Sequence, residues 1–513
     1  MQVPAFAMTS TAMRIASSFG FCCFLLYVGF VLREKIAFSR KIMLPAPLIG
    51  GVIGLIFVQL CNLNENVKAV VEHDWIIGWS ELPTFLMNII FTTMFMGNRV
   101  PGIGEAWKWA GPQLAYGQIL AWGNWTVSCF ITVVLLTPAY GTHVLFGSIF
   151  PIGFEAGHGA AAGYTESFIN LGFMDGGDLA LTVSTIGMLS GVILGTLICN
   201  LGQRQLWTRS SYEAGLSIEE PCCESEKRYN SRIEPTTSEL SQEEISMIRD
   251  WRLKAVIDPN ERKPGSYSTI SVEAMESFSL HLAFIGLATF LAYWTKRGLI
   301  GVEQLDDWLT EYSFFSGFPL FPLCMIWGLI IQIFVDRFCT VSPLDRPTME
   351  RIGGIALDFL ILTAIASTRV DAISSQVVAM LILVLVGMAW QLFAFFVLAP
   401  MMLPDYWFER GIAELGKSMG TTATGIMLLQ MVDPNHKTTA LKAFTCKQML
   451  HEPFMGGGIW TSLALPLVVS LGNWGVFGIS VGFIAFWLII WFVFFRRLKE
   501  GPMVQYKYNP VYN

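Results

Sequence analysis

The chain has 513 residues, of which 53% are hydrophobic and only 14% are charged. With a mean hydropathy of +0.53, its polar side chains cannot cover a water-soluble globule of this size, so the protein needs a lipid bilayer around it. The net charge of −6 at pH 7 is modest, and no basic patch points to a nucleic-acid partner.

The cysteines and the N-terminal segment give no sign of a secreted or metal-binding protein. The ten cysteines show no C-x-x-C or Cys/His spacing, so we expect small buried side chains rather than zinc ligands or disulfides. The first apolar run, Ile15 to Leu32, is long enough to remain as a membrane span, and no clear cleavage signal accompanies it.

Apolar runs long enough to cross about 30 Å of hydrocarbon follow one another along the chain. In the first half they predict spans at 12–32, 45–61, 82–97, 110–136 and 179–201. In the second half they predict spans at 277–295, 318–336, 352–368, 376–402 and 448–471, and one additional span at 474–495.

Two segments interrupt this pattern, at about 145–171 and 407–432. The first contains Pro151, Glu155 and a run of Gly and Ala, which an ordinary lipid-facing helix would not carry. The second contains a run of Gly, Ser and Thr from 416 to 425. Freed backbone groups at membrane depth are tolerated only against protein or a watery cavity, so we expect two re-entrant hairpins.

A polar region at 203–276 separates the two sets of spans and is predicted to be a soluble linker. The fold class is therefore an all-α polytopic membrane protein with two inverted repeats of five spans, each with a re-entrant hairpin. The predicted divisions are 1–202 for the first half, 203–276 for the linker, 277–471 for the second half and 472–513 for the extra span and tail. The motif at Pro47-Leu48 recurs at Pro322-Leu323, which supports the repeat.

The basic residues predict the orientation of the chain. If the loop after the first span, with Arg33 and Lys41, is cytoplasmic, alternation places most of the 33 Lys and Arg residues inside. In that count Lys417 and Lys447 lie on the cytoplasmic side. We therefore expect the N-terminus outside, with the linker and the C-terminus in the cytoplasm.

Chemistry is expected at the two interruptions and at ionisable groups near membrane depth. An unpaired charge there is costly, so each such group is a candidate for a site. The candidates are Glu155, His158, Glu166, Asp358, His451 and Glu452. The alternative interpretation is helix packing at the Gly/Ala runs, an interfacial position for Glu166 and Glu452, and a helix-helix ion pair for Asp358.

The order of several motifs resembles the bacterial sodium/glutamate symporter family. The motifs are Leu44-Pro45-Ala46-Pro47-Leu48-Ile49-Gly50-Gly51, Phe91-Thr92-Thr93-Met94, Gly157-His158-Gly159, Leu357-Asp358-Phe359-Leu360 and Ser418-x-Gly420-x-Thr422-x-Thr424. The resemblance implies a homodimer in the inner membrane, with a scaffold and a moving core in each protomer. It also implies that substrate and Na+ lie between two hairpin tips and reach either side by an elevator-like movement.

This resemblance and the hydroxyl run give the expected site residues. Those expected to bind substrate are Glu155, Gly157, His158, Gly159, Ser418, Gly420, Thr421, Thr422 and Thr424. The candidate Na+ ligands are Asp358, Thr422, Thr424 and Glu155. The chain departs from the family where Glu155 replaces a small or hydroxyl residue and Ala423 replaces a proline.

Three functions are compatible with these residues. The first is a Na+-coupled symporter of glutamate or a related acidic amino acid, with Na+ as coupling ion. The second is a transporter on the same scaffold that carries another carboxylate or uses H+, with the proton on Glu155. The third is a membrane enzyme that uses His451 and Glu452 or Glu155 and His158, but no nucleophile motif or metal triad accompanies them, so we expect no enzyme.

Overall fold

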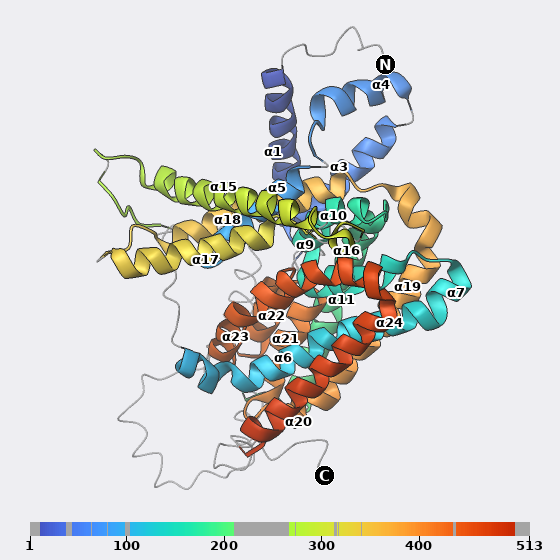
Figure 1. Cartoon of the computed structure of the whole chain (residues 1–513), viewed down its shortest axis with the longest axis vertical. Helices are drawn as coiled ribbons and strands as arrows, with labels where there is room; N and C mark the ends of the chain where they lie inside the picture. The colour runs from blue at the N-terminus through green and yellow to red at the C-terminus, as the bar shows by residue number, and fades with distance from the viewer. Residues whose placement is uncertain are drawn as a thin grey trace.

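A computed structural model of the chain shows an all-helical protein, and within the described residues there is no β-strand (Figure 1). It describes residues 11–36, 44–62, 64–79, 81–97, 103–209, 266–271, 273–311, 315–316, 318–339, 341–433 and 438–497. Seven helical stretches in these ranges are long and apolar enough to cross a membrane. The predicted all-α, multi-pass membrane class is therefore confirmed. Most of the predicted linker at 203–276 lies outside the described residues.

One set of helices forms what we call the frame group. Its members are α1 (Thr11–Lys35), α3 (Ala46–Cys61), α5 (Leu82–Thr93), α15 (Ser277–Glu303), α17 (Phe321–Phe338) and α18 (Arg346–Ala366). α18 packs against α3 and α5, α17 packs against α5, and α1 packs against α3, so helices from both halves of the sequence alternate (Figure 1). Gly50 and Gly54 allow this close packing, because a Cβ on Gly50 would lie 2.6 Å from the Leu25 carbonyl oxygen and one on Gly54 2.9 Å from the Ala366 methyl carbon.

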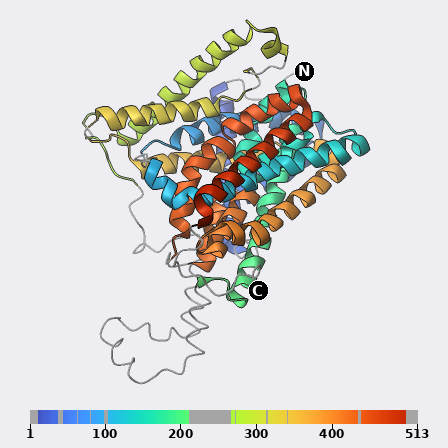
Figure 2. The ribbon, with the colours of Figure 1, turned by 60° about the horizontal axis from the view of Figure 1, so that its bottom comes forward.

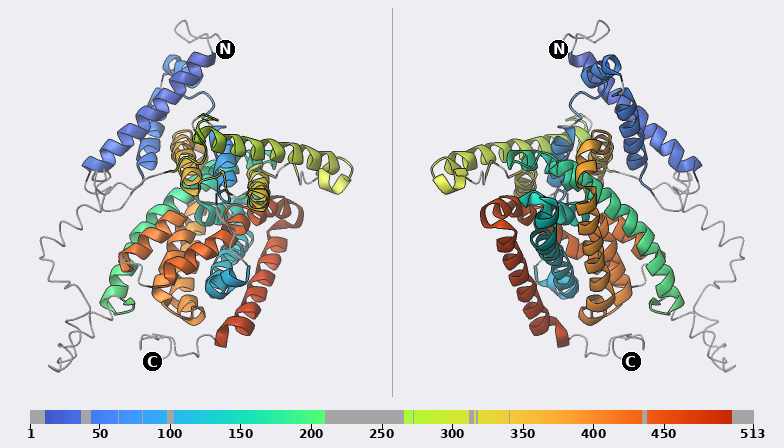
Figure 3. Two further views of the ribbon diagram at one scale, coloured as in Figure 1. Left: turned by 90° about the vertical axis from the view of Figure 1, so that its left-hand side faces the viewer. Right: turned by 90° about the vertical axis from the view of Figure 1, so that its right-hand side faces the viewer.

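The remaining long helices form what we call the core group. They are α6 (Ile103–Ile131), α11 (Gly176–Arg204), α19 (Val370–Phe393), α21 (Trp407–Met419), α22 (Thr422–Val432), α23 (Ala440–Met455) and α24 (Ile459–Ile490). α24 runs along α6, and α21 packs against both α22 and α11 (Figure 2). Figure 3 shows α1 and α15 extending away from this compact group.

Short elements connect these helices. The short α-helices are α4 (Glu65–Val70), α7 (Thr137–Tyr140), α8 (Ile149–Pro151), α9 (Gly157–Gly163), α10 (Thr165–Asn170), α16 (Asp307–Glu311) and α20 (Ala399–Met402). Single π-helical turns lie at Val71–Trp75, Thr132–Leu136, Ile152–Ala156, Ala394–Leu398 and Trp491–Phe495, and a 3-10 helix lies at Val144–Ser148. α9 contacts α5 and α18, so this short helix joins the core group to the frame group.

Three predicted spans differ from the structure. The run at 448–471 is not one helix, because α23 ends at Met455 and a Gly-Gly-Gly turn at 456–458 precedes α24. α24 then continues through the predicted boundary near 472, where Gly472 has a φ of +70° and bends the helix. α5 has only 12 residues and is therefore about 18 Å long, too short to cross the bilayer by itself.

Candidate functional site

The two interrupted segments meet inside the core group. In the first, the turn Ile152–Ala156 breaks before α9 at Gly157, which has a φ of +71° that favours glycine. In the second, α21 and α22 are separated at Gly420. A Cβ on Gly157 would lie 3.0 Å from the Gly420 carbonyl oxygen, so the two breaks are in direct contact.

Glu155 precedes this contact point, and its side chain is only 4% exposed. Its carboxylate forms an ion pair with Lys417 of α21, whose ammonium also donates to the Glu155 carbonyl oxygen at 3.1 Å. The three other donors are Ser418 Oγ at 2.5 Å, His451 Nε2 at 2.9 Å and Asn124 Nδ2 at 3.2 Å. Both carboxylate oxygens are therefore satisfied by residues of α6, α21 and α23.

Amides of α6 and α19 orient these donors. Gln391 Nε2 donates to Asn124 Oδ1 at 2.8 Å and to Ser418 Oγ at 2.9 Å. The amide of Gln118 is oriented by the indole of Trp122, which can only donate and lies 3.1 Å from the Gln118 oxygen.

This orientation fixes the tautomer of His451. Because the Gln118 oxygen accepts from Trp122, its Nε2 faces His451 Nδ1 at 3.3 Å and must donate to it. His451 therefore carries its proton on Nε2 and donates it to Glu155. It serves here as a neutral hydrogen-bond donor rather than as a second cation.

A second buried ion pair lies next to the first. Lys447 Nζ is 2.8 Å from Glu414 Oε2, and these two side chains are 0% and 1% exposed. Gln113 of α6 donates to the other oxygen of Glu414 at 2.9 Å, and Lys447 also donates to Gln448 Oε1 at 2.9 Å.

Glu452 is a third carboxylate in the same network, and its hydrogen-bond donors in the described structure are neutral. Its Oε2 accepts from Gln448 Nε2 at 2.8 Å and from the Thr422 hydroxyl at 3.3 Å. When Glu155, Glu414 and Glu452 are all ionised against Lys417 and Lys447, with His451 neutral, the network carries one excess negative charge. We refer to this set of residues as the buried network.

The structure brings together only some of the predicted site residues. Glu155, Ser418 and Thr422 take part in the buried network, and Gly157 and Gly420 form the contact between the breaks. Among the remaining candidates, Thr421 caps α22 by accepting from Thr424 N at 3.3 Å.

His158, Gly159 and Asp358 lie elsewhere. His158 Nε2 is 3.0 Å from Thr185 Oγ1 on α11, and Gly159 faces Met87 of the frame group. Asp358 lies on an exposed face of α18 and does not contact the buried network.

Sequence reasoning missed several members of the network, namely Asn124, Gln391, Glu414, Lys417 and Lys447. The sequence analysis counted Lys417 and Lys447 only as basic residues of the cytoplasmic side, whereas both side chains are at most 1% exposed and lie in buried ion pairs. One available signal was the spacing of Glu414 and Lys417, opposite charges three residues apart beside an interrupted span, although in the structure each pairs with another residue.

The family comparison bears on this arrangement. The family model of the sodium/glutamate symporter matches residues 11–234. This match confirms the predicted family resemblance. It includes the helices from α1 to α11, and hence Glu155 and the first break at Gly157, whereas the break at Gly420 lies beyond it. The sodium/glutamate symporters are transporters, in agreement with the membrane-spanning helices. No curated protein matches the chain.

Proposed function

We propose that the protein is a Na+-coupled symporter of glutamate or a related acidic amino acid. The observation that carries this proposal is the contact between the breaks at Gly157 and Gly420, beside a buried network of three carboxyl groups and two ammonium groups. Interrupted helices that meet in a membrane protein are typical of substrate and ion sites in secondary transporters. The family match to residues 11–234 supports the same function.

We assign the coupling ion to Thr422 and Glu452. A bound Na+ would neutralise the excess charge, and carboxylate and hydroxyl oxygens suit this hard cation. Among the other predicted ligands, Glu155 has both oxygens engaged and Thr424 lies beside the capping hydroxyl of Thr421. The exposed Asp358 is the remaining candidate.

The substrate carboxylates are proposed to bind at the N-terminal ends of α9 and α22. Helix N-termini attract anions through their free N–H groups. Ionised Glu155 would repel such a substrate, but Lys417 neutralises it, so the pair presents no net charge. We therefore propose that Glu155 positions Ser418 and Asn124 and that a substrate ammonium group adds to, rather than replaces, the Lys417 contact.

The proposed architecture follows from the two groups of helices. We propose that the frame group is static, that the core group moves as an elevator, and that the breaks are the tips of the re-entrant segments at about 145–171 and 407–432. The division into inverted halves, 1–202 and 277–471, stays part of this proposal, with the linker between them and the 472–513 segment after them. We also propose that the protein is a homodimer in the inner membrane, with its N-terminus outside and its linker and C-terminus in the cytoplasm.

Coupling to H+ is the second candidate, and Glu452 favours it over Glu155. Glu452 has only Gln448 and Thr422 as hydrogen-bond partners in the described structure, so a proton could replace Na+ in neutralising the excess charge. An enzyme is less well supported, because His451 has both ring nitrogens engaged and hence no lone pair for general-base work.

The test is uptake of radiolabelled L-glutamate into proteoliposomes with and without a Na+ gradient, at several pH values. Thr422→Val removes one oxygen ligand and should raise the Na+ concentration for half-maximal uptake roughly tenfold, which corresponds to about 1.4 kcal/mol. Glu452→Gln should abolish the Na+ dependence. The matched control is Thr445→Val, because the Thr445 hydroxyl is exposed and bonds only carbonyls of its own helix.

The outcomes separate the candidates. Wild-type Na+ dependence in both Thr422→Val and Glu452→Gln would remove the Na+ assignment. Uptake that follows a pH gradient without Na+, and loses this dependence in Glu452→Gln, would establish H+ coupling instead. An absence of uptake for L-glutamate and related acids under every gradient would refute the transport proposal.

A further inference from the structure

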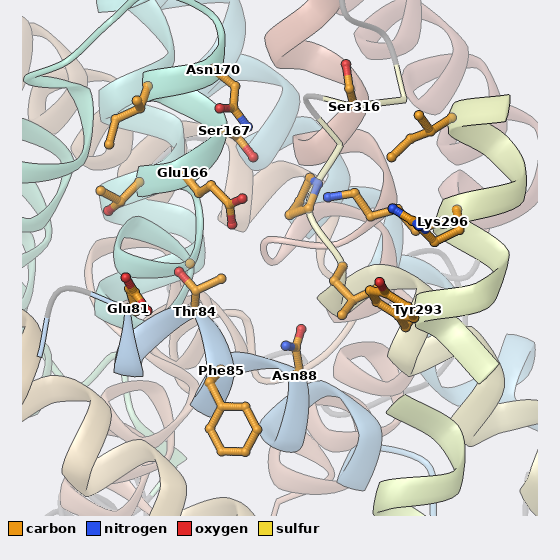
Figure 4. A pocket seen from close by; sticks show the side chains of 17 residues that line it. Glu81, Thr84, Phe85, Asn88, Glu166, Ser167, Asn170, Tyr293, Lys296 and Ser316 are labelled. Carbon is orange, nitrogen blue, oxygen red and sulfur yellow. The ribbon is translucent and has the colours of Figure 1, made fainter. Parts of the chain in front are cut away.

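A pocket of about 860 Å³ lies apart from the buried network, between α5, α10 and α15 (Figure 4). On α5 and the residue before it the pocket is lined by Glu81, Thr84, Phe85 and Asn88, and on α15 by Tyr293, Lys296, Arg297 and Ile300. These residues recur every three or four positions, so each helix contributes a single face. The remaining wall comes from residues 163–170 and from the chain before α17.

Opposite charges line opposite walls of this pocket. Glu81 and Glu166 lie on the side of α5 and α10, and Lys296 and Arg297 lie on α15. Figure 4 shows the side chains of Glu166 and Lys296 pointing toward one another across the space. Lys296 is attracted to Glu166 and to Glu303 at longer range. Within the described part of the chain no direct ion pair joins Glu166 to Lys296, so a ligand that enters between them can contact both charges.

The base of the pocket holds a buried acceptor that lacks a partner. Asn88 is 6% exposed, and its Oδ1 has no hydrogen bond among the described residues. A buried polar atom without a partner requires an explanation, and a donor on a ligand would supply one. Figure 4 places the Asn88 oxygen toward the cavity, on the side where Glu166 also points.

A buried carboxylate, Glu303, holds Ser316 of the pocket wall in place. Glu303 is 4% exposed and accepts from Ser316 N at 2.8 Å and from Ser316 Oγ at 3.1 Å. These two hydrogen bonds fix Ser316, so the part of the pocket wall that it forms has a defined position. Phe85 and Ile169 are 56% and 41% exposed and give the pocket apolar walls.

We propose that this pocket binds a zwitterion whose ammonium group carries N–H donors. Its ammonium group lies between Glu166 and the Asn88 oxygen, and its oxyanion lies at Lys296. The apolar walls accommodate a hydrocarbon part of the same molecule. Two sources share this chemistry: the head group of phosphatidylethanolamine and a free α-amino acid. The pocket does not depend on the buried network. Because α10 packs against α11 of the core group, a ligand that contacts α5, α15 and α10 would hold the frame group to the core group.

The experiment measures protection of a cysteine placed in the pocket. The full chain carrying Thr84→Cys is reconstituted in phosphatidylcholine nanodiscs, whose quaternary ammonium has no N–H to donate. Reaction of the introduced thiol with a water-soluble maleimide is followed by peptide mass spectrometry. The probes are phosphatidylethanolamine in the nanodisc and L-glutamate in solution, with phosphatidylglycerol and succinate as anions that lack an ammonium group.

A zwitterion present at ten times its Kd should slow labelling roughly elevenfold, because the unoccupied fraction falls by that factor. In Lys296→Met or Glu166→Gln, a tenfold weaker affinity leaves roughly twofold protection at the same concentration. Arg351→Met, which removes an exposed cation outside the pocket, should retain full protection. Asn170→Cys on α10 gives a second labelling position in the pocket if the Thr84 variant folds poorly.

Protection by phosphatidylethanolamine alone assigns the site to a lipid, and protection by L-glutamate alone assigns it to an amino acid. The proposal is overturned if neither probe protects, if the anionic controls protect equally, or if protection is unchanged in Lys296→Met and Glu166→Gln. This readout needs neither uptake nor Na+, so its failure is distinct from a failure of the transport proposal.

Discussion

Replacing Lys417 by methionine tests how much the buried Glu155–Lys417 ion pair contributes to the free energy of unfolding. The substitution keeps most of the side-chain volume but leaves the Glu155 carboxylate, 4% exposed, with neutral partners only. Breaking a buried ion pair on one side typically costs about 3–5 kcal/mol, because the remaining charge stays desolvated. Lys417→Met should therefore lower the free energy of unfolding by about 3–5 kcal/mol.

The double variant separates charge from packing. Glu155→Gln also leaves one buried charge without its partner, whereas Glu155→Gln with Lys417→Met leaves none. The double variant should cost less than the sum of the two single variants, with a coupling free energy of about 2–3 kcal/mol. Glu350→Gln is the control, because it breaks an exposed pair that is worth at most about 1 kcal/mol.

The assay is a denaturant titration of the purified protein in detergent, followed by the fluorescence of its 17 tryptophans. A cost for Lys417→Met no larger than that for Glu350→Gln would refute the reasoning. So would strict additivity of the two single variants, since residues in one ion pair should couple.

Three further predictions concern the breaks and the topology. Gly157→Ala should reduce uptake and lower the free energy of unfolding by about 1–2 kcal/mol, because it puts a side chain at positive φ against the Gly420 carbonyl oxygen. The control is Gly354→Ala, whose added methyl group meets no atom within 4 Å and which should change neither uptake nor the denaturant titration. In intact cells, Leu471→Cys should react with an impermeant thiol reagent added outside. The native Cys222 in the linker should not, and efficient labelling of it would contradict the inverted halves.

The two breaks could be predicted from sequence because their cause is local. Gly157 and Gly420 lie in runs of small residues that cannot form an ordinary lipid-facing span, and the structure breaks the helices at both positions. Local composition also indicated that Glu155 and Thr422 were candidates. It could not indicate that Lys417 pairs with Glu155, because that contact joins residues 262 positions apart.

The errors in the predicted spans also have physical causes. Hydropathy continued the third span to 97, but α5 ends at Thr93, where Arg346 Nη1 donates to the carbonyl oxygens of Thr93, Met94 and Met96 in place of a further helical turn. The guanidinium comes from the second half of the sequence, so nothing near Thr93 indicated this end. The buried ion pairs of Lys417 and Lys447 could not be predicted for the same reason, because a count of charges does not show which carboxylate each ammonium contacts.

The long sequence separation between Glu155 and Lys417 has a consequence for the synthesis and membrane insertion of the chain. At about 5–20 residues per second, extending the chain by the 262 positions from Glu155 to Lys417 takes roughly 13–52 s. During that interval Glu155 has left the ribosome while its ammonium partner does not yet exist. The nascent first half must therefore keep this carboxylate hydrated, protonated or outside the hydrocarbon until α21 arrives, so completion of the buried network belongs to a late step of assembly.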